Sequence, residues 1–387
     1  MQEIAVVTAT RAEYGLLRPV VRALRASGAF RVSLLVTGAH LSEAYGETVR
    51  EIERDDMPIA ARIPILSGDD TPRGVSGTMA NALNGFAAYF EAHRPDALLV
   101  LGDRYEILAV CCAAMNARIP IFHLHGGETT QGAVDEAIRH SITKMSLLHF
   151  TSNEQHRRRV IQLGEQPDRV FNVGAPGVEN ALHVPLLSKE ALAESVGLPL
   201  QKPYAVVTFH PVTLEDEPPE RQLFELFAAM DAFDLEYIIT KANADAGGLA
   251  INRAVDDYAA KRDNVAAFDS LGLVRYLSAV KYCAFVAGNS SSGILEAPSF
   301  GVPTVNIGDR QKGRMQAESV LQCAPARADI ARAFAQALTP AFQNKAAHAV
   351  NPYGDGDTSG KIVAILQRVF SGPLDLKKTF YDIDFTV

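Results

Sequence analysis

The sequence is poor in cysteine, in basic residues and in long apolar runs, and each shortage excludes a class of protein. Its 387 residues include 4 cysteines, without a CxxC pair. Because these cysteines lie in or beside apolar segments, we expect buried, reduced thiols. The 45 acidic residues outnumber the 37 basic ones, and the formal net charge is -8. This balance argues against a nucleic-acid surface, which needs clustered Lys and Arg.

No apolar run approaches the roughly 18 to 20 residues of a membrane span. The first residues, "MQEIAVVTAT", begin a strand-like pattern at once and show neither a basic segment nor a signal cleavage site. We therefore expect a cytoplasmic protein that contacts no membrane. Because the chain is acidic overall, any anionic ligand has to be held by local groups.

The length favours about two domains of ~150 to 200 residues each. Short β-rich runs such as "IAVVTA", "ALLVLG" and "YAVVTFHP" alternate with helical stretches such as "GLLRPVVRALRAS". Continuous apolar strands with helical crossovers predict parallel sheets covered on both faces. The predicted fold class is therefore α/β, with two Rossmann-like, doubly wound domains.

The strand and helix pattern restarts after a Pro-, Gly- and Leu-rich stretch near residues 176–203. We predict a first domain over 1–175, a linker over 176–203, a second domain over 204–365 and a C-terminal tail over 366–387. The last helical stretch, "SGKIVAILQRVF", follows the second sheet and is placed to pack across the junction.

Polar segments follow the predicted strands at six places. They are "TATRAEYG", "GDRYE" and "HLHGGE" in the first domain, and "FHPVT", "TKANADAGG" and "GNSSSGILEAP" in the second. Each could be an ordinary turn or helix cap. Ligands of open α/β sheets bind beyond the carboxyl ends of the strands, however, so six such segments together predict a site in a cleft.

The segment "GNSSSGILEAP" predicts a cradle for a diphosphate. Free backbone N–H groups and hydroxyls of Ser290, Ser291, Ser292 and Gly293 would face the ligand at the start of a helix. Glu296 is placed to accept hydrogen bonds from a ribose diol, or else is a solvated acid of the first helical turn. Neither a GK[ST] loop nor a GxGxxG fingerprint occurs, which argues against ATP and NAD.

Other candidate ligand contacts are spread along the chain. Arg11, Arg104 and Arg310 each occupy a strand-end loop from which they could reach phosphate, although surface arginines need no such role. Asn243 of "TKANADAGG" is a further candidate for contact with the nucleotide.

Taken together, these segments resemble a known family. "TRAEYG", "GDRYE", "HLHGGE", "DEAIRHSITKMSLLHFTS", "FHPVT", "GNSSSGILEAPSFGVP" and "NIGDRQKGR" are similar to the hydrolysing UDP-N-acetylglucosamine 2-epimerases of sialic acid biosynthesis, from the first strand to about Tyr353. The resemblance implies a fold like GT-B glycosyltransferases, with UDP held mainly by the second domain. It also implies that UDP-GlcNAc and water give N-acetylmannosamine and UDP, without a metal or other cofactor.

The implied reaction explains the crowding of acids and imidazoles. In the family mechanism UDP leaves C1 while a base removes the C2 proton, and water then adds to the glycal with inverted configuration at C2. Such a reaction needs several proton-transfer groups. The motifs place Asp103, Asp135 and Glu136 in this role, and His210 next to the diphosphate or leaving group.

One position departs from the family pattern. Many members have "HxEGGE", whereas this chain has His125 in place of the first carboxylate, a form that also occurs in the family. Either His125 or Glu128 then takes the role of that carboxylate. The structural alternatives are a core histidine at 125 and an anion at a helix N-terminus at 128. His140 and His149 are predicted to be packing residues.

Three other functions stay open. His123 and His125 with Asp103 and Asp135 could hold Zn or Mn in a hydrolase, and the fold suits a glycosyltransferase or a catalytically silent nucleotide-sugar sensor. Within the family, UDP-2,4-diacetamido-trideoxyhexose of the legionaminic acid pathway is a second possible substrate. The resemblance and the apolar faces of "AEYGLLRPVVRAL" and "GVSGTMANALNGFAAYF" further predict a homodimer or homotetramer.

Overall fold

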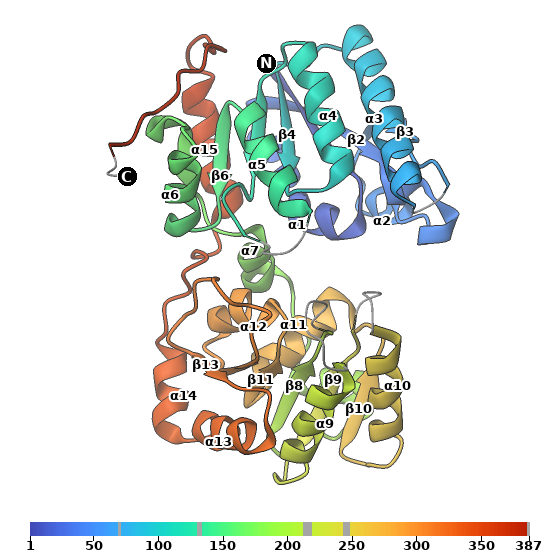
Figure 1. Ribbon diagram of the computed structural model, residues 1–387, viewed down its shortest axis with the longest axis vertical. Helices are drawn as coiled ribbons and strands as arrows, with labels where there is room; N and C mark the ends of the chain where they lie inside the picture. The colour runs from blue at the N-terminus through green and yellow to red at the C-terminus, as the bar shows by residue number, and fades with distance from the viewer. Residues whose placement is uncertain (69–70, 130–133, 212–218, 243–247, 385–387) are drawn as a thin grey trace. The chain divides into compact units, whose positions relative to one another are not determined.

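The computed structural model describes residues 1–68, 71–129, 134–211, 219–242 and 248–384. The chain divides into two compact units, the first comprising Met1–Asn180 with Tyr353–Val387 and the second comprising Ala181–Pro352. Each unit has its own parallel sheet with helices on both sides (Figure 1). The predicted fold class, two parallel α/β domains, is confirmed.

The first unit is built on a sheet of seven parallel strands in the order β3-β2-β1-β4-β5-β6-β7. The strand order reverses between β1 and β4, which is where ligands of such sheets bind. The strands are β1 (Gln2–Thr8), β2 (Phe30–Thr37), β3 (Ile59–Ile63), β4 (Ala97–Leu101), β5 (Ile121–Leu124), β6 (Leu148–Thr151) and β7 (Val170–Asn172). The helices are α1 (Arg11–Ala26), α2 (Val49–Arg54), α3 (Pro72–Ala92), α4 (Tyr105–Asn116), α5 (Asp135–Met145), α6 (Glu154–Gln162), α7 (Pro176–His183) and α15 (Thr358–Val369).

Burial on both faces explains why the central strands are continuously apolar. Along β1, Ile4 and Val6 belong to the core on one face of the sheet. Ala5 and Val7 belong to the core on the other face. Because successive side chains of a strand point to opposite faces, a strand covered on both sides has no polar alternation.

The second unit repeats the plan with six parallel strands in the order β10-β9-β8-β11-β12-β13. Its strand order reverses between β8 and β11. The strands are β8 (Tyr204–Thr208), β9 (Glu236–Thr240), β10 (Val265–Phe268), β11 (Phe285–Gly288), β12 (Thr304–Ile307) and β13 (Val320–Cys323). The helices are α8 (Lys189–Val196), α9 (Pro219–Met230), α10 (Gly248–Ala259), α11 (Gly272–Tyr282), α12 (Ser292–Leu295), α13 (Arg327–Ala337) and α14 (Pro340–Ala347).

The unit boundaries differ from the predicted domain boundaries at two places. The predicted linker contains α7 and α8, and Leu192 and Val196 of α8 are buried in the core of the second unit. Residues 353–365, predicted to belong to the second domain, belong to the first. There α15 packs against α1, and its Ile362 and Leu366 are fully buried (Figure 1). The carboxylate of Glu179 accepts a hydrogen bond of 2.7 Å from the backbone N–H of Ser359 and thereby holds the start of α15.

The apolar face of α1 is therefore used inside the unit. Leu17, Val20, Val21 and Leu24 are all buried in the same core as the residues of α15. This face of α1 is therefore not available for a subunit interface, and the predicted homodimer or homotetramer stays a prediction. Within the described part of the chain, no helix is long and apolar enough to cross a membrane. The thiols of Cys111 and Cys283 are free and buried.

The segment that follows α15 is fastened to the first unit by a charged cluster. The ammonium group of Lys378 lies 2.7 Å from the carboxylate of Glu165 and donates to the backbone carbonyls of Lys144 and Ser146. Glu165 also contacts the ammonium of Lys144 at 2.6 Å and His149 Nε2 at 3.0 Å. Burial alone would raise the pKa of Glu165, but these partners outweigh it and lower the pKa to about 2.

We expect Lys378→Met to reduce stability, because it removes a charged partner from a carboxylate that is only 1% exposed. Losing such contacts costs on the order of 1 to 3 kcal/mol. Stability contributed by a carboxylate with a lowered pKa is present above its ordinary value of 4.5 and is lost as the pH falls towards 2. The difference in melting temperature between wild type and variant should therefore be large at pH 7 and should shrink below about pH 4.5.

The matched control is Lys377→Met, because Lys377 is exposed and its ammonium group makes no ion pair in the described part of the chain. Equal melting temperatures for wild type and Lys378→Met at pH 7 would contradict a stabilising role for the cluster.

Candidate active site

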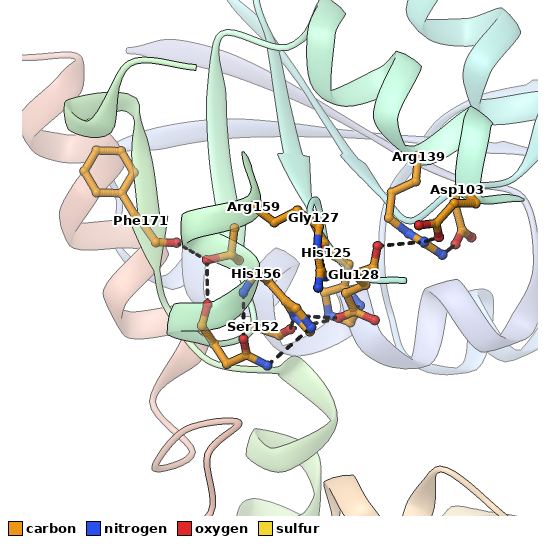
Figure 2. Close-up of polar contacts among 12 residues, drawn as sticks. Asp103, His125, Gly127, Glu128, Arg139, Ser152, His156, Arg159 and Phe171 are labelled. Carbon is orange, nitrogen blue, oxygen red and sulfur yellow. Dashed lines mark hydrogen bonds and ion pairs between the residues drawn. The ribbon is translucent and has the colours of Figure 1, made fainter. Parts of the chain in front are cut away.

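The predicted acids and imidazoles of the first unit gather at the carboxyl edge of its sheet. Asp103 follows β4, while His125 and Glu128 follow β5. Ser152 follows β6, and α5 begins at Asp135. Figure 2 shows two groups of side chains here, one with Asp103 and Arg139 and the other with His125, Glu128 and Ser152. This edge lies beside the strand-order reversal, where the sheet leaves room for a ligand.

The first group is organised by Arg139 of α5. Its guanidinium, only 4% exposed, forms ion pairs with Asp103 and, at 2.9 Å, with Glu136. It also donates a hydrogen bond of 2.9 Å to the backbone carbonyl of Glu128. A buried cation is stabilised by two such carboxylates, which partner the charge that burial strips of water. The structure thus brings together three of the predicted residues around an arginine that sequence reasoning did not select.

The carboxyl group of Asp135, at the start of α5, has a shifted pKa. Burial and the charge of Asp103 raise its pKa, against the opposing effect of Arg139. Crowded carboxylates thereby separate into groups that hold a proton with different strength, as proton-transfer chemistry requires. His140, predicted to be a packing residue, instead lies 3.3 Å from the carboxylate of Glu136 and is half-buried.

The second group surrounds the carboxylate of Glu128. Ser152 Oγ donates to Glu128 Oε1 over 2.8 Å, and His125 Nδ1 lies 3.4 Å from the same oxygen. Ser152 Oγ is also 2.8 Å from His156 Nδ1. Ser152 and His156 were not among the predicted site residues. The motif "DEAIRHSITKMSLLHFTS" ends on Ser152, so a search one strand further along the same sheet edge could have found it.

A tight turn places this second group. His125 has a left-handed backbone with φ of 66°, and Gly127 follows with φ of 78°. A Cβ atom on Gly127 would lie 2.3 Å from the backbone oxygen of His156, so only glycine fits. The guanidinium of Arg159 donates to the carbonyl of Gly127 and holds the turn against α6. The pair of glycines in "HLHGGE" is therefore explained by close packing.

His123 has a structural role in the core. Its ring is fully buried between the carbonyl of Gly102, at 2.8 Å, and the hydroxyl of Thr143, at 3.3 Å. Burial lowers its pKa to about 3, so the ring is neutral. Within the described residues, no group of three or more His, Cys, Asp or Glu is arranged to hold a metal ion. Asp103, a ligand in the metal hydrolase hypothesis, is paired with Arg139 instead.

The two arginines predicted to reach phosphate from the first unit are both paired with carboxylates. Arg11 is 61% exposed and lies 3.0 Å from Glu51. Arg104 lies 2.5 Å from the buried carboxylate of Glu106. Arg11 can exchange partners at low cost, because an exposed ion pair is weak, whereas moving Arg104 would leave the buried carboxylate of Glu106 without its cation.

In the second unit, the predicted cradle has a shorter helix than expected. α12 has only 4 residues, Ser292–Leu295, and a 3-10 turn at Ala297–Phe300 follows it. Pro298 lies inside this turn, which breaks the helical hydrogen-bond pattern. A single helical turn has a small dipole, so the predicted contribution of a helix N-terminus to phosphate binding is weak here.

Asn289 ties the end of β11 to the end of β8. Its side-chain oxygen accepts from the backbone N–H of His210 at 2.7 Å, and its side-chain nitrogen donates to the carbonyl of His210 at 2.8 Å. Its own carbonyl accepts from Arg310 at 3.2 Å and from Gln311 at 2.8 Å. Asn289 thus positions His210 and Arg310, two predicted site residues, at the strand-order reversal of the second sheet.

A cluster of buried polar atoms lies under the same loop. Ser292 Oγ, Glu296 Oε2 and the hydroxyl of Tyr276 are buried, and Ser292 lies beside both of the other two, yet none of the three atoms makes a hydrogen bond of full geometry in the described part of the chain. Burial raises the pKa values of Glu296 and Tyr276. Unpaired buried polar groups are costly, so they indicate a place for a polar ligand. Sequence reasoning selected Glu296 and Ser292 but missed Tyr276, which reads as an ordinary residue of α11. Asn243 lies outside the described residues.

Comparisons with known proteins agree with this architecture. Residues 22–367 match the family described as UDP-N-acetylglucosamine 2-epimerase. The chain is 40% identical over 385 residues to the polysialic acid biosynthesis protein P7 of Escherichia coli, an alignment that covers 99% of this chain and 98% of that protein. It is also 40% identical over 322 residues to a hydrolysing GDP/UDP-N,N'-diacetylbacillosamine 2-epimerase of Campylobacter jejuni, covering 83% and 84% of the two chains.

A solved structure has the same two-unit plan. The UDP-GlcNAc 2-epimerase of Neisseria meningitidis bound to UDP-GlcNAc superposes with a TM-score of 0.76 at 18% identity, covering 95% of this chain and 100% of that one. The fold defines a protein of two parallel α/β domains, each with polar side chains at the carboxyl ends of its strands. More particularly, the chain belongs to the UDP-N-acetylglucosamine 2-epimerase family.

Proposed function

We propose that this protein is a hydrolysing 2-epimerase that converts UDP-N-acetylglucosamine and water to N-acetylmannosamine and UDP. The observation that carries the proposal is the pair of proton-transfer groups at the carboxyl edge of the first sheet, one around Arg139 and one around Glu128. Membership of the family supports the choice of a nucleotide sugar as the substrate.

The reaction divides into two halves that both move protons. In the first, a base takes the C2 proton, the electrons of the C2–H bond form a C1=C2 double bond, and UDP leaves with the C1–O electron pair. In the second, an acid protonates C2 from the opposite face and water adds to C1. Groups with different proton affinities, placed on two sides of the sugar, are what these steps need.

The group around Arg139 supplies anions of two kinds. Asp103 and Glu136 are held as carboxylates by the buried guanidinium, which also fixes their orientation. Asp135, whose pKa is raised, is the member best suited to carry and deliver a proton. His125 and Glu128 form the opposite side of the site.

The second unit is proposed to hold the UDP group. The unpaired buried atoms of Ser292 and Glu296 suit the hydroxyls of a ribose, which both donate and accept hydrogen bonds. His210 and Arg310, both tied to Asn289, then face the diphosphate together with the backbone of Ser290, Ser291 and Gly293.

A second substrate has support from the relatives. The protein of Campylobacter jejuni that is 40% identical is named for diacetylbacillosamine, a sugar with two acetamido groups. The polysialic acid protein, 40% identical over nearly the whole chain, is named for polysialic acid biosynthesis, which fits the sialic acid route that the sequence motifs imply. We therefore propose UDP-N-acetylglucosamine first and the UDP-2,4-diacetamido sugar as the competing substrate.

The reaction class predicts solvent hydrogen in the product. Incubated in deuterated water, UDP-N-acetylglucosamine should give UDP and free N-acetylmannosamine with deuterium at C2, because the C2 proton is lost and replaced. NMR of the released sugar measures both its configuration and its isotope content.

The same assay run on each UDP-sugar separates the substrates by kcat/KM. A glycosyltransferase would release UDP only when a sugar acceptor is present. A released sugar that retains its C2 proton would rule out the elimination mechanism.

Replacing Asp103 by Asn should nearly abolish turnover while UDP binding persists, because the proposed nucleotide contacts lie in the other unit. Loss of a proton-transfer group, or of its charge, costs about 10² to 10⁴-fold in rate. Turnover, UDP affinity by calorimetry and melting temperature should be measured together.

The matched control is Asp96→Asn, just before the same strand at its other end. Asp96 accepts a hydrogen bond of 2.7 Å from the backbone of Glu3, which an Asn oxygen can also accept. Wild-type turnover in Asp103→Asn would remove this residue from the mechanism.

Replacing Glu296 by Ala should weaken UDP binding by about 1 to 3 kcal/mol, the range for a hydrogen bond to a charged group. Calorimetric titration with UDP checks this directly. Glu318→Ala is the control, because that side chain is 77% exposed and pairs only distantly, at 3.7 Å, with Lys345. If UDP binds both variants as tightly as wild type, the nucleotide is held elsewhere.

A further inference from the structure

We propose that His125 is the base that takes the C2 proton and that Glu128 is its positioning residue, so that the two act as an imidazole–carboxylate pair. This inference rests on the proposed function and deepens it by dividing the roles of two residues that the sequence motif leaves open. It follows from the hydrogen-bond geometry around Glu128.

The hydroxyl proton of Ser152 determines which nitrogen of His156 carries a proton. A serine hydroxyl has one proton to donate, and Ser152 Oγ donates it to Glu128 Oε1 at 2.8 Å. The contact of 2.8 Å between Ser152 Oγ and His156 Nδ1 then requires that the imidazole be the donor. His156 therefore carries its proton on Nδ1.

The other nitrogen of His156 agrees with this tautomer. His156 Nε2 lies 3.5 Å from the side-chain nitrogen of Asn153, which can only donate, so Nε2 is an acceptor. Asn153 is itself oriented, because its side-chain oxygen accepts from the backbone N–H of His156 at 2.9 Å. These contacts assign His156 a neutral ring, whose Nδ1 lies 3.9 Å from Glu128 Oε1.

His125 is the nearer of the two imidazoles to the carboxylate of Glu128. Its Nδ1 lies 3.4 Å from Glu128 Oε1, the oxygen that Ser152 also contacts. This contact is an ion-pair distance and not a directed hydrogen bond; a proton placed on Nδ1 by the nearby carboxylate leaves the lone pair of the ring on Nε2. That nitrogen is buried and has no hydrogen-bond partner in the part of the chain that the structure describes.

The backbone conformation of His125 indicates that the surrounding fold holds this residue in place. Its φ of 66° lies in the left-handed region, which a residue with a Cβ rarely adopts. Its backbone N–H is nevertheless bonded to the carbonyl of Phe150 at 3.0 Å, so the strand pairing continues to this residue. The turn directly after β5 thereby holds the ring beside Glu128.

The arrangement gives a balanced proton-transfer step. Nε2 takes the C2 proton, the C2–H electron pair forms the C1=C2 bond, and the C1–O pair departs with UDP. The imidazolium that results is stabilised by the carboxylate 3.4 Å away. In the second half, an acid of the Arg139 group protonates C2, water adds to C1, and the proton that water loses restores the acid. His125 returns its own proton to solvent.

The test compares pH profiles, because base and positioning residue affect them differently. In wild type, kcat/KM should fall at acid pH as His125 becomes protonated. In His125→Asn, chosen because Asn tolerates a left-handed backbone, the rate should drop about 10² to 10⁴-fold and the acid limb should vanish. In Glu128→Gln the rate should drop as well, but the limb should persist and move to lower pH, since loss of an anion disfavours the imidazolium.

A second variant distinguishes the loss of a base from misfolding of the protein. His125→Gly suits the left-handed backbone and leaves space for an added ring, so imidazole in the buffer should restore part of the lost rate in proportion to its neutral form. His93→Asn is the control; His93 is exposed and lies at the C-terminal end of α3, so its pH profile should match wild type.

Two results would overturn the proposal. One is a His125→Asn enzyme with wild-type rate or with an unchanged acid limb. The other is a Glu128→Gln enzyme in which the limb vanishes while His125→Asn keeps it, which would make Glu128 the base. Both outcomes are separate from failure of the proposed function, in which wild type itself would release no UDP and introduce no deuterium at C2.

Discussion

The site of the first unit depends on one buried cation. Arg139 lies between Asp103 and Glu136 and also bonds the backbone of Glu128, so it joins the loops after β4 and β5 to the start of α5. Without this charge, two carboxylates so close together would repel each other, and one would take up a proton. The guanidinium thus fixes the positions of the acids, while burial and the charge of Asp103 raise the pKa of the neighbouring Asp135.

The sequence was sufficient to predict the fold class and most of the central strands, because a strand buried on both faces of its sheet is a continuous run of apolar residues. The edge strands β3 and β13 give no such pattern, since they are only partly buried and carry polar residues such as Arg62 and Gln322. The boundaries failed for a different reason. Whether α15 packs on the first or the second sheet depends on contacts of Ile362 and Leu366 with residues distant in sequence. The spacing of apolar residues along the chain predicts a helix but does not predict which sheet that helix covers.

For the site, strand ends predicted where Asp103, His125 and Glu128 would lie, because parallel strands bring their carboxyl ends to one edge. The same reasoning did not select Arg139, Ser152 or Tyr276, whose importance comes from burial and partners and not from residue type alone. Arg139 is the clearest case. An arginine three residues after Glu136 on a helix reads as a surface ion pair, yet its side chain is only 4% exposed.

The location of α15 has a consequence for how the protein is made. The second unit is one continuous segment, residues Ala181–Pro352, whereas the first is assembled from both ends of the chain. During synthesis the second unit can fold as soon as it has left the ribosome, because domains fold largely as units. The first unit, although begun earlier, leaves Leu17 and Leu24 of α1 without the cover of Ile362 and Leu366 until α15 has been synthesised. The first unit is therefore completed after the second, and the apolar face of α1 stays uncovered in the nascent chain until then.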